Sequence, residues 1–279
     1  MQLTQKKSRR GDLLTAAAVA MLLAVMAALL YTGSLTRQVT NMLIPTAVYI
    51  VMAVSLNLVV GLLGELSLGH AGFMSVGLFS GCLVAIALTN TALPLMVRLP
   101  VSMLAGGLTA AVFGLLVGLP TLRLRGDYLA IVTLACGEII KNIITNLRVT
   151  GGALGLNTSA IYAGAKELLP YGAALVLLTV AVMLNLKRSK YGRAIMAIRD
   201  NRIAAESVGL SVTRYKLAVF VIAAFFAGCA GVLYGHSLAN IKAAAFDYNM
   251  SIEILVIVVL GGMGSVPGSV VSAIVLTVL

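Results

Sequence analysis

The first residues that could do chemistry lie in the stretch from Gly61 to Phe73, GLLGELSLGHAGF, where Glu65, Ser67 and His70 stand among four glycines. Apolar sequence on both sides is typical of membrane-spanning helices. An ionisable side chain at membrane depth costs about 2.5–3.5 kcal/mol, so it tends to face a cavity or a partner. The stretch therefore predicts part of a polar pathway. The alternative is that Glu65 and Ser67 form a cytoplasmic loop while the glycines pack helices.

A second polar stripe lies further along the chain, in RLRGDYLAIVTLACGEIIKNIITNLRVTGGALGL. Glu138, Asn142 and Asn146 recur every four residues and share one helical face, with Lys141 beside it. Three interpretations stay open: this face lines a pathway or gate, it packs against another subunit, or Glu138 and Lys141 neutralise each other locally.

A third stretch, VLGGMGSVPG from Val259 to Gly268, interrupts apolar sequence with glycines and a proline. It predicts a helix break that either lines the path or acts as a hinge. Together the three stretches give the candidate pathway or gate residues, which are Glu65, Ser67, His70, Glu138, Lys141, Asn142, Gly151, Gly152, Gly261, Gly262 and Gly264.

Residues that would indicate catalysis or metal binding are missing from the sequence. It has no glycine-rich phosphate loop and no paired Cys or His spacing, and His70 and His236 lie far apart. Cys82, Cys136 and Cys229 all fall inside apolar runs, as small core residues do. We therefore predict that the chain is not an enzyme and has no catalytic residue, metal site or cofactor of its own.

The elements that must position these residues are membrane-spanning helices. Hydrophobic residues make up 60% of the 279, charged residues 10%, and the mean hydropathy is +1.05. A soluble protein of this size cannot bury so much apolar surface. The sequence predicts an all-α polytopic fold in one transmembrane domain, residues 1–279, with at least eight spans. These fall near 13–31, 42–63, 70–89, 99–119, 128–147, 169–186, 216–236 and 251–279.

The basic residues set the expected orientation. The net charge of +11 could indicate nucleic acid, but Lys and Arg lie in the segments between spans instead of on one continuous face. Most of them fall on one side of the predicted membrane, beginning with Lys6, Lys7, Arg9 and Arg10. Because basic segments stay on the cytoplasmic side, we predict a cytoplasmic N-terminus and no nucleic-acid partner.

The longest polar segment is 187–216, KRSKYGRAIMAIRDNRIAAESVGLSVTRYK. Ile195 and Ile198 have helical spacing, Asp200 and Asn201 can form an N-cap, and Gly209 suits a left-handed C-terminal cap. The segment predicts two short amphipathic helical turns at the cytoplasmic membrane surface. The alternative is a charge cluster that stops translocation and is helical by accident.

Several motifs together resemble one known family. GELSLGHAGF, RLRGDYLAIVTLACGEI, TGGALGL, GRAIMAIRDNRIAAESVGLS and VLGGMGS occur in the order found in inner-membrane permeases of branched-chain amino acid ABC transporters. The chain is most similar to their M-type subunit, over about residues 40–279. The resemblance implies a multi-pass permease of the bacterial inner membrane that imports leucine, isoleucine and valine.

The same resemblance implies partners: a second permease subunit, two cytoplasmic ATPase subunits that bind the ATP, and an extracytoplasmic substrate-binding protein. It also implies that the segment 187–216 is the coupling loop that docks into the ATPase. The residues that would carry this contact are Gly192, Arg193, Arg199, Asp200, Ala204, Ala205, Glu206 and Gly209.

The chain departs from the family pattern at two positions. Glu65 stands where the family usually has an uncharged amide, and Leu154 where a polar residue is common. These departures leave open a permease for urea, short amides or other amino acids. From a different class, an ion-coupled secondary transporter would use Glu65, Glu138 and His70 for coupling, and a structural role is a third option.

Overall fold

The computed structural model describes residues 17–30, 32, 36–89, 94–124 and 126–279. Apolar sequence of helical length forms most of the elements, and glycine-rich or polar stretches separate them. After a helix at Ala17–Leu30, the elements in chain order are α2 (Arg37–Asn57), the π-helix η1 (Leu58–Leu63), α3 (His70–Thr89), α4 (Leu95–Thr121), α5 (Asp127–Asn146), the 3₁₀ turn η2 (Gly152–Leu154), β1 (Leu156–Asn157), α6 (Ala165–Arg188), α7 (Lys190–Asp200), α8 (Arg202–Ser207), α9 (Val212–His236), β2 (Asn240–Ile241), the 3₁₀ turn η3 (Ala243–Ala245), α10 (Tyr248–Gly261) and α11 (Val266–Val278).

The prediction of an all-α polytopic fold is confirmed. Within the described ranges, seven helical segments are long and apolar enough to cross a membrane, and Ala17–Leu30 and Val266–Val278 are shorter apolar helices. The expected first span and its basic flank extend into 1–16 and 31, outside the described residues, so the cytoplasmic N-terminus stays a prediction. The expected last span, 251–279, is divided into α10 and α11, because Gly262 and Gly264 have φ of +88° and +83°.

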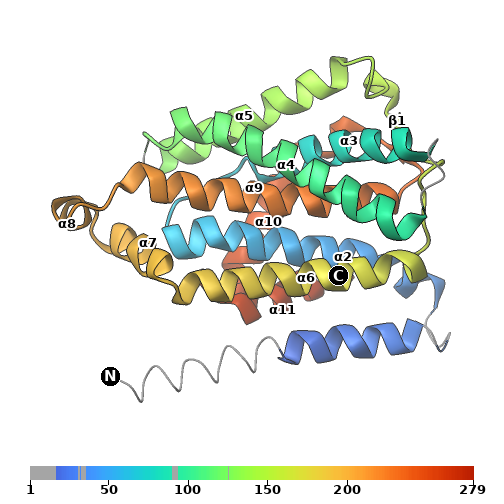
Figure 1. Ribbon diagram of the computed structural model, residues 1–279, viewed down its shortest axis with the longest axis horizontal. Helices are drawn as coiled ribbons and strands as arrows, with labels where there is room; N and C mark the ends of the chain where they lie inside the picture. Colours follow the sequence, from blue (N-terminus) through green and yellow to red (C-terminus); the bar gives the residue numbers. More distant parts are fainter. Residues whose placement is uncertain (1–16, 31, 33–35, 90–93, 125) are drawn as a thin grey trace.

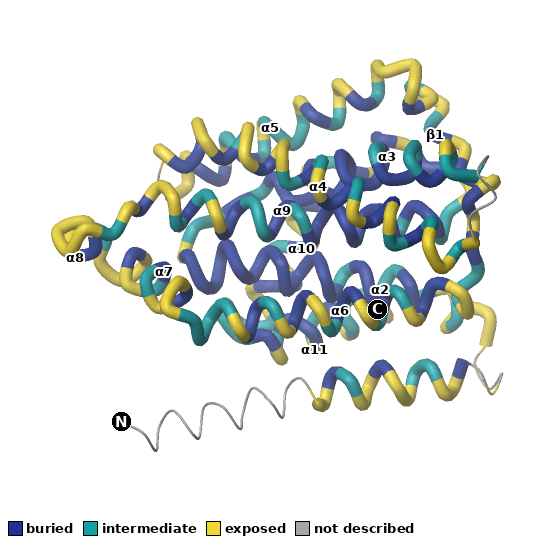
Figure 2. The backbone as a smooth tube through the Cα atoms, viewed as in Figure 1, coloured by how far each residue is buried: buried dark blue, intermediate teal, exposed yellow. Residues whose placement is uncertain are grey.

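The bundle is organised around α2 and around a tight group formed by α3, α4 and α9. Figure 2 shows buried backbone along α2 and α9 and more exposed backbone along α5. Small residues let α3 and α9 approach closely: a Cβ on Gly77 would lie 2.2 Å from the Cα of Gly228. Helices in membranes pack in this way because close contact, and not the hydrophobic effect, drives their association.

The polar segment 187–216 contains two capped helices at one end of the bundle (Figure 1). The Gly192 N–H donates to Ser189 Oγ at 3.0 Å at the start of α7, and the Ala204 N–H donates to Asn201 Oδ1 at 3.0 Å at the start of α8. Gly209, at φ +84°, follows the end of α8. The predicted pair of short helices, with the Asn201 cap, is confirmed. We call Lys190–Ser207 the α7–α8 segment.

The opposite end of the bundle carries a two-residue antiparallel pairing, in which Leu156 of β1 lies opposite Ile241 of β2. The 24 residues of α6 join the two ends. We expect a cysteine at Asn157 to react with an impermeant thiol reagent from outside the cell, and a cysteine at Ser189 only from inside. Labelling of both from the same face would contradict the membrane crossing of α6.

Candidate functional site

The stretch with Glu65, Ser67 and His70 is a non-helical passage between two spans. The π-helix η1 ends at Leu63, the next residue, Gly64, has φ +76°, and α3 begins only at His70. Two neighbouring helices satisfy the freed backbone: the Leu68 N–H donates to Thr133 Oγ1 of α5 at 3.0 Å, and the Ala71 N–H donates to Ser251 Oγ of α10 at 3.3 Å. Non-helical backbone inside a membrane protein needs such internal partners.

The three predicted side chains of this passage point to different neighbours. Glu65 forms an ion pair with Lys216 of α9, and the two side chains are only 12% and 5% exposed. His70 Nε2 lies 2.8 Å from Ser55 Oγ of α2, with both groups buried. Ser67 Oγ is buried and, within the described part of the chain, has no hydrogen-bond partner. The structure thus brings Glu65 to α9 and His70 to α2.

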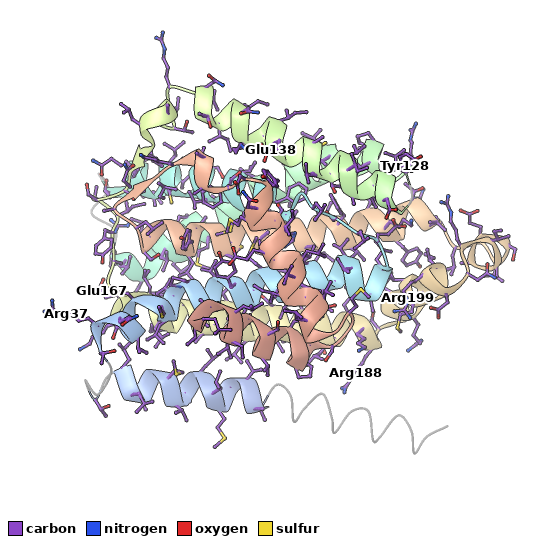
Figure 3. All side chains as sticks on the ribbon, turned by 180° about the vertical axis from the view of Figure 1, so that it is seen from behind. Arg37, Tyr128, Glu138, Glu167, Arg188 and Arg199 are labelled. Atoms are coloured by element: carbon purple, nitrogen blue, oxygen red, sulfur yellow. The ribbon has the colours of Figure 1, made fainter. Side chains whose placement is uncertain are left out.

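The polar face of α5 lies beside the start of α10 (Figure 3). Glu138 forms an ion pair with Lys141, and its Oε1 accepts a hydrogen bond from the Tyr248 N–H at 2.9 Å. The local ion pair expected from the spacing is therefore present, but the rest of the polar face of α5 stays exposed. Asn142 and Asn146 are exposed and line a shallow surface depression with Ile139, Ile143 and Leu147.

The glycines of the third stretch form the tight turn between α10 and α11. One buried side chain of α2 holds this turn: Asn57 Oδ1 accepts from the Gly264 N–H at 2.7 Å, and Asn57 Nδ2 donates to Ser265 O at 3.1 Å and to Ser269 Oγ at 2.7 Å. Asn57 was not among the predicted residues. Its signal was available, because it is an amide inside an apolar run, and a polar group at that depth must find a partner.

The paired glycines Gly151 and Gly152 lie at the other end of the bundle. They turn the chain after α5 with φ of +79° and +59°, and the Gly152 N–H donates to Leu147 O at 3.2 Å. They are therefore separated from Gly261, Gly262 and Gly264 by the length of the bundle. The structure divides the predicted pathway residues between its two ends and its interior.

The predicted coupling residues divide by exposure. Arg193, Arg199, Asp200, Ala204, Glu206 and Gly209 are exposed, whereas Gly192 and Ala205 are buried. A Cβ on Gly192 would lie 2.0 Å from Leu186 O, and Ala205 packs in a small apolar cluster with Ile198 and Val212. Two apolar side chains missed by the sequence analysis stand out on and just after α8: Ile203 is 81% exposed and Val208 is 75% exposed.

The α7–α8 segment and the adjoining Val208 combine exposed apolar and charged side chains. Arg202 Nε bonds Glu206 Oε1 at 2.9 Å across one turn of α8, and Arg199 bonds Asp200 Oδ1 at 3.1 Å. Single exposed apolar residues are ordinary, but two of them beside capped helix ends form a compact surface suited to a partner protein. The geometry is that of a bundle of apolar helices with two short, partly exposed helices at one end.

A polytopic bundle of apolar helices with buried polar helix breaks defines the class: a multi-pass helical membrane protein. The comparisons give the family. Residues 38–279 match the family described as "Branched-chain amino acid transport system / permease component", and the chain belongs to that family. No solved structure matches the chain.

Several curated proteins are similar to it. The chain is 37% identical over 272 residues to the high-affinity branched-chain amino acid transport system permease protein LivM of Salmonella typhimurium, covering 84% of this chain and 60% of the relative. It is 38% identical over 266 residues to LivM of Escherichia coli K12, with the same coverage. The permease protein LivH of Salmonella typhimurium is 30% identical over 99 residues, 36% of this chain and 32% of the relative. The chain thus spans about 60% of the length of the LivM proteins that it matches.

Proposed function

We propose that the chain is the transmembrane permease subunit of an ATP-driven importer for branched-chain amino acids in a bacterial inner membrane. The observation that carries the proposal is the α7–α8 segment, whose exposed Ile203, with the adjoining Val208, would form a docking surface outside the spans. The similarity to LivM supports the substrate class: leucine, isoleucine and valine. The chain itself would bind no ATP and hold no cofactor.

The proposed partners follow from the surfaces of the bundle. Two cytoplasmic ATPase subunits would bind the importer, one of them on the α7–α8 segment of this chain. A second permease subunit would cover the polar face of α5, because Asn142 and Asn146 are exposed there and polar side chains facing lipid are costly. A substrate-binding protein would dock at the β1–β2 end. ATP binding can drive such an importer only if it favours one arrangement of the permease over another.

Uptake in a bacterial host that lacks its own branched-chain amino acid systems tests the function. The chain is expressed with its ATPase, second permease and binding protein, and uptake of labelled leucine is measured. We expect uptake to stop on ATP depletion and to persist when a protonophore collapses the proton gradient. Loss of uptake with the gradient alone would favour an ion-coupled transporter. Competition by urea or short amides, and not by isoleucine or valine, would overturn the substrate class.

The docking surface is tested by replacing Ile203 with Asp. Burying a carboxylate against the ATPase is unfavourable, so we expect about tenfold less co-purified ATPase with normal membrane yield. The matched control is Val149→Asp at the other end of the bundle, where Val149 is 68% exposed. Equal ATPase recovery with the two variants would contradict docking on α8.

We further propose that the α5 face lines a pathway or gate at the interface with the second permease subunit, and replacing Glu138 with Gln tests this role. Gln keeps the shape and an acceptor oxygen for the Tyr248 N–H, and Glu138 and Lys141 are 28% and 19% exposed, so we expect near-normal yield with partial loss of leucine uptake. Glu167→Gln, at an exposed position in the first turn of α6, is the control. If the yield falls and Lys141→Met restores it together with full uptake, the pair is structural and the pathway role is wrong.

A further inference from the structure

Two places where the helical backbone is irregular near the α7–α8 end touch each other. One is the π-helix η1, and the other is the turn from Gly262 to Ser265 between α10 and α11. A Cβ on Gly61 would lie 2.2 Å from the Gly264 nitrogen and 2.0 Å from Asn57 Oδ1, so the two backbones are in direct contact. The Asn57 amide, fully buried, bonds the turn from the end of α2.

Basic side chains from either end of α7 hold these two irregular segments. Arg199, in the last turn of α7, donates from Nη1 to Gly61 O at 3.0 Å, and its side chain lies over Gly64. Lys187, at the end of α6 just before α7, donates from Nζ to Gly264 O at 3.0 Å. One carbonyl of each irregular segment therefore accepts a hydrogen bond from a charged donor beside the proposed docking element (Figure 3 labels Arg199).

Irregular backbone of this kind is suited to movement. A π-helix and a turn of positive-φ glycines can change conformation locally without breaking a long run of helical hydrogen bonds, and π-bulges are frequent at functional sites. Charge-assisted hydrogen bonds are about twice as strong as neutral ones, so the two basic side chains can fix one conformation of each segment. Because Gly61 and Gly264 touch, a change of conformation in one segment would press on the other.

We propose that η1 and the turn 262–265 form a single hinge. Its positioning residues are Lys187, Arg199 and Asn57, whose hydrogen bonds hold the hinge in one conformation. Movement of α7 would then change the path of α2 and the angle between α10 and α11 together. The source of that movement, ATPase docking, rests on the proposed function. The mechanical coupling of the two segments does not, and it is measured without transport.

Hydrogen–deuterium exchange on the full chain in lipid nanodiscs tests the coupling. Lys187→Gln and Arg199→Gln each remove one charged donor, from one segment only. We expect about tenfold faster exchange in both peptides, 58–65 and 262–269, for either variant, the size of effect of losing one hydrogen bond to a charged group. Lys187→Arg keeps a charged donor at this position, so both peptides should exchange as slowly as in the wild type. The control is Lys190→Gln, because Lys190 is exposed and lies 5.3 Å from the ring centre of its neighbour Tyr191.

Faster exchange confined to the segment that lost its donor, or no change in either, overturns the single hinge. If a variant does not accumulate in the membrane, the same exchange measurement is made on the wild-type chain in complex with its proposed ATPase subunits. Exchange in the two peptides is compared without nucleotide and with trapped ATP: change in both supports the hinge, and change in one alone overturns it. Leucine uptake is scored separately. A different transported solute would refute the proposed function and leave the exchange result intact, whereas unlinked peptides beside normal leucine uptake would refute only the hinge.

Discussion

Replacing Glu65 with Gln is expected to remove most of the folded protein from the membrane. Glu65 and Lys216 pair in the interior, at 12% and 5% side-chain exposure, so the variant leaves a buried ammonium without its counter-charge. Removing one partner of a buried ion pair typically costs about 3–5 kcal/mol, a large part of the stability of a domain. The measurement is membrane yield together with thermal unfolding of the detergent-solubilised protein.

A second substitution separates the charge effect from a loss of shape. In Glu65→Gln with Lys216→Met both charges are gone, and such replacements are often close to neutral, so we expect yield to recover. Arg202→Gln is the control, because it removes the exposed pair with Glu206, and exposed pairs contribute about 0–1 kcal/mol. Normal yield of the single Glu65 variant would show that the pair does not stabilise the fold.

Replacing Gly77 with Ala is also expected to destabilise the bundle. Ala favours a helix interior over Gly by about 1 kcal/mol. Here that gain is outweighed, because the added Cβ would meet the Cα of Gly228 at 2.2 Å and its carbonyl oxygen at 2.8 Å. Backbone cannot rotate away as a side chain can, so α3 and α9 must separate, and overpacking of this kind costs about 1–3 kcal/mol or more. Thermal unfolding in detergent measures the loss.

Gly137 provides the matched control for Gly77. It also faces a glycine of another segment, but a Cβ there would lie 3.6 Å from the Cα of Gly69, an ordinary van der Waals distance. We expect Gly137→Ala to unfold at the same temperature as the wild type or slightly higher, from helix propensity alone. Equal effects of the two substitutions would show that glycine as such matters at these positions, and not the close contact of α3 with α9.

Features set by neighbours in sequence could be predicted from the sequence. The apolar runs predict the spans, the glycines after Leu260 predict the division of α10 from α11, and Asn201 predicts the start of α8. The Glu138–Lys141 pair follows from a spacing of three residues on one helix. Each of these depends on helical periodicity or on the φ preference of a single residue, which a short window of sequence contains.

Features set by distant residues could not be predicted. Glu65 was interpreted as lining a pathway or lying in a loop, because its partner Lys216 is 151 positions away and no local pattern points to it. Likewise the sequence indicates a break near Gly262 but not that Asn57 and Lys187 hold it. Exposed Ile203 and Val208 were missed because their apolar character fits a buried face equally well until packing decides.

The position of Asn57 in the chain affects the order in which the protein matures during synthesis. Its amide is made early, but the Gly264 N–H that it binds comes 207 residues later. At about 5–20 residues per second, translation needs about 10–40 s to supply that partner. For this time the Asn57 amide lacks the partners that it has in the folded protein. The end of α2 must therefore take its final form after α10 and α11 have left the ribosome, which makes the joining of the two halves of the chain a late event in biogenesis.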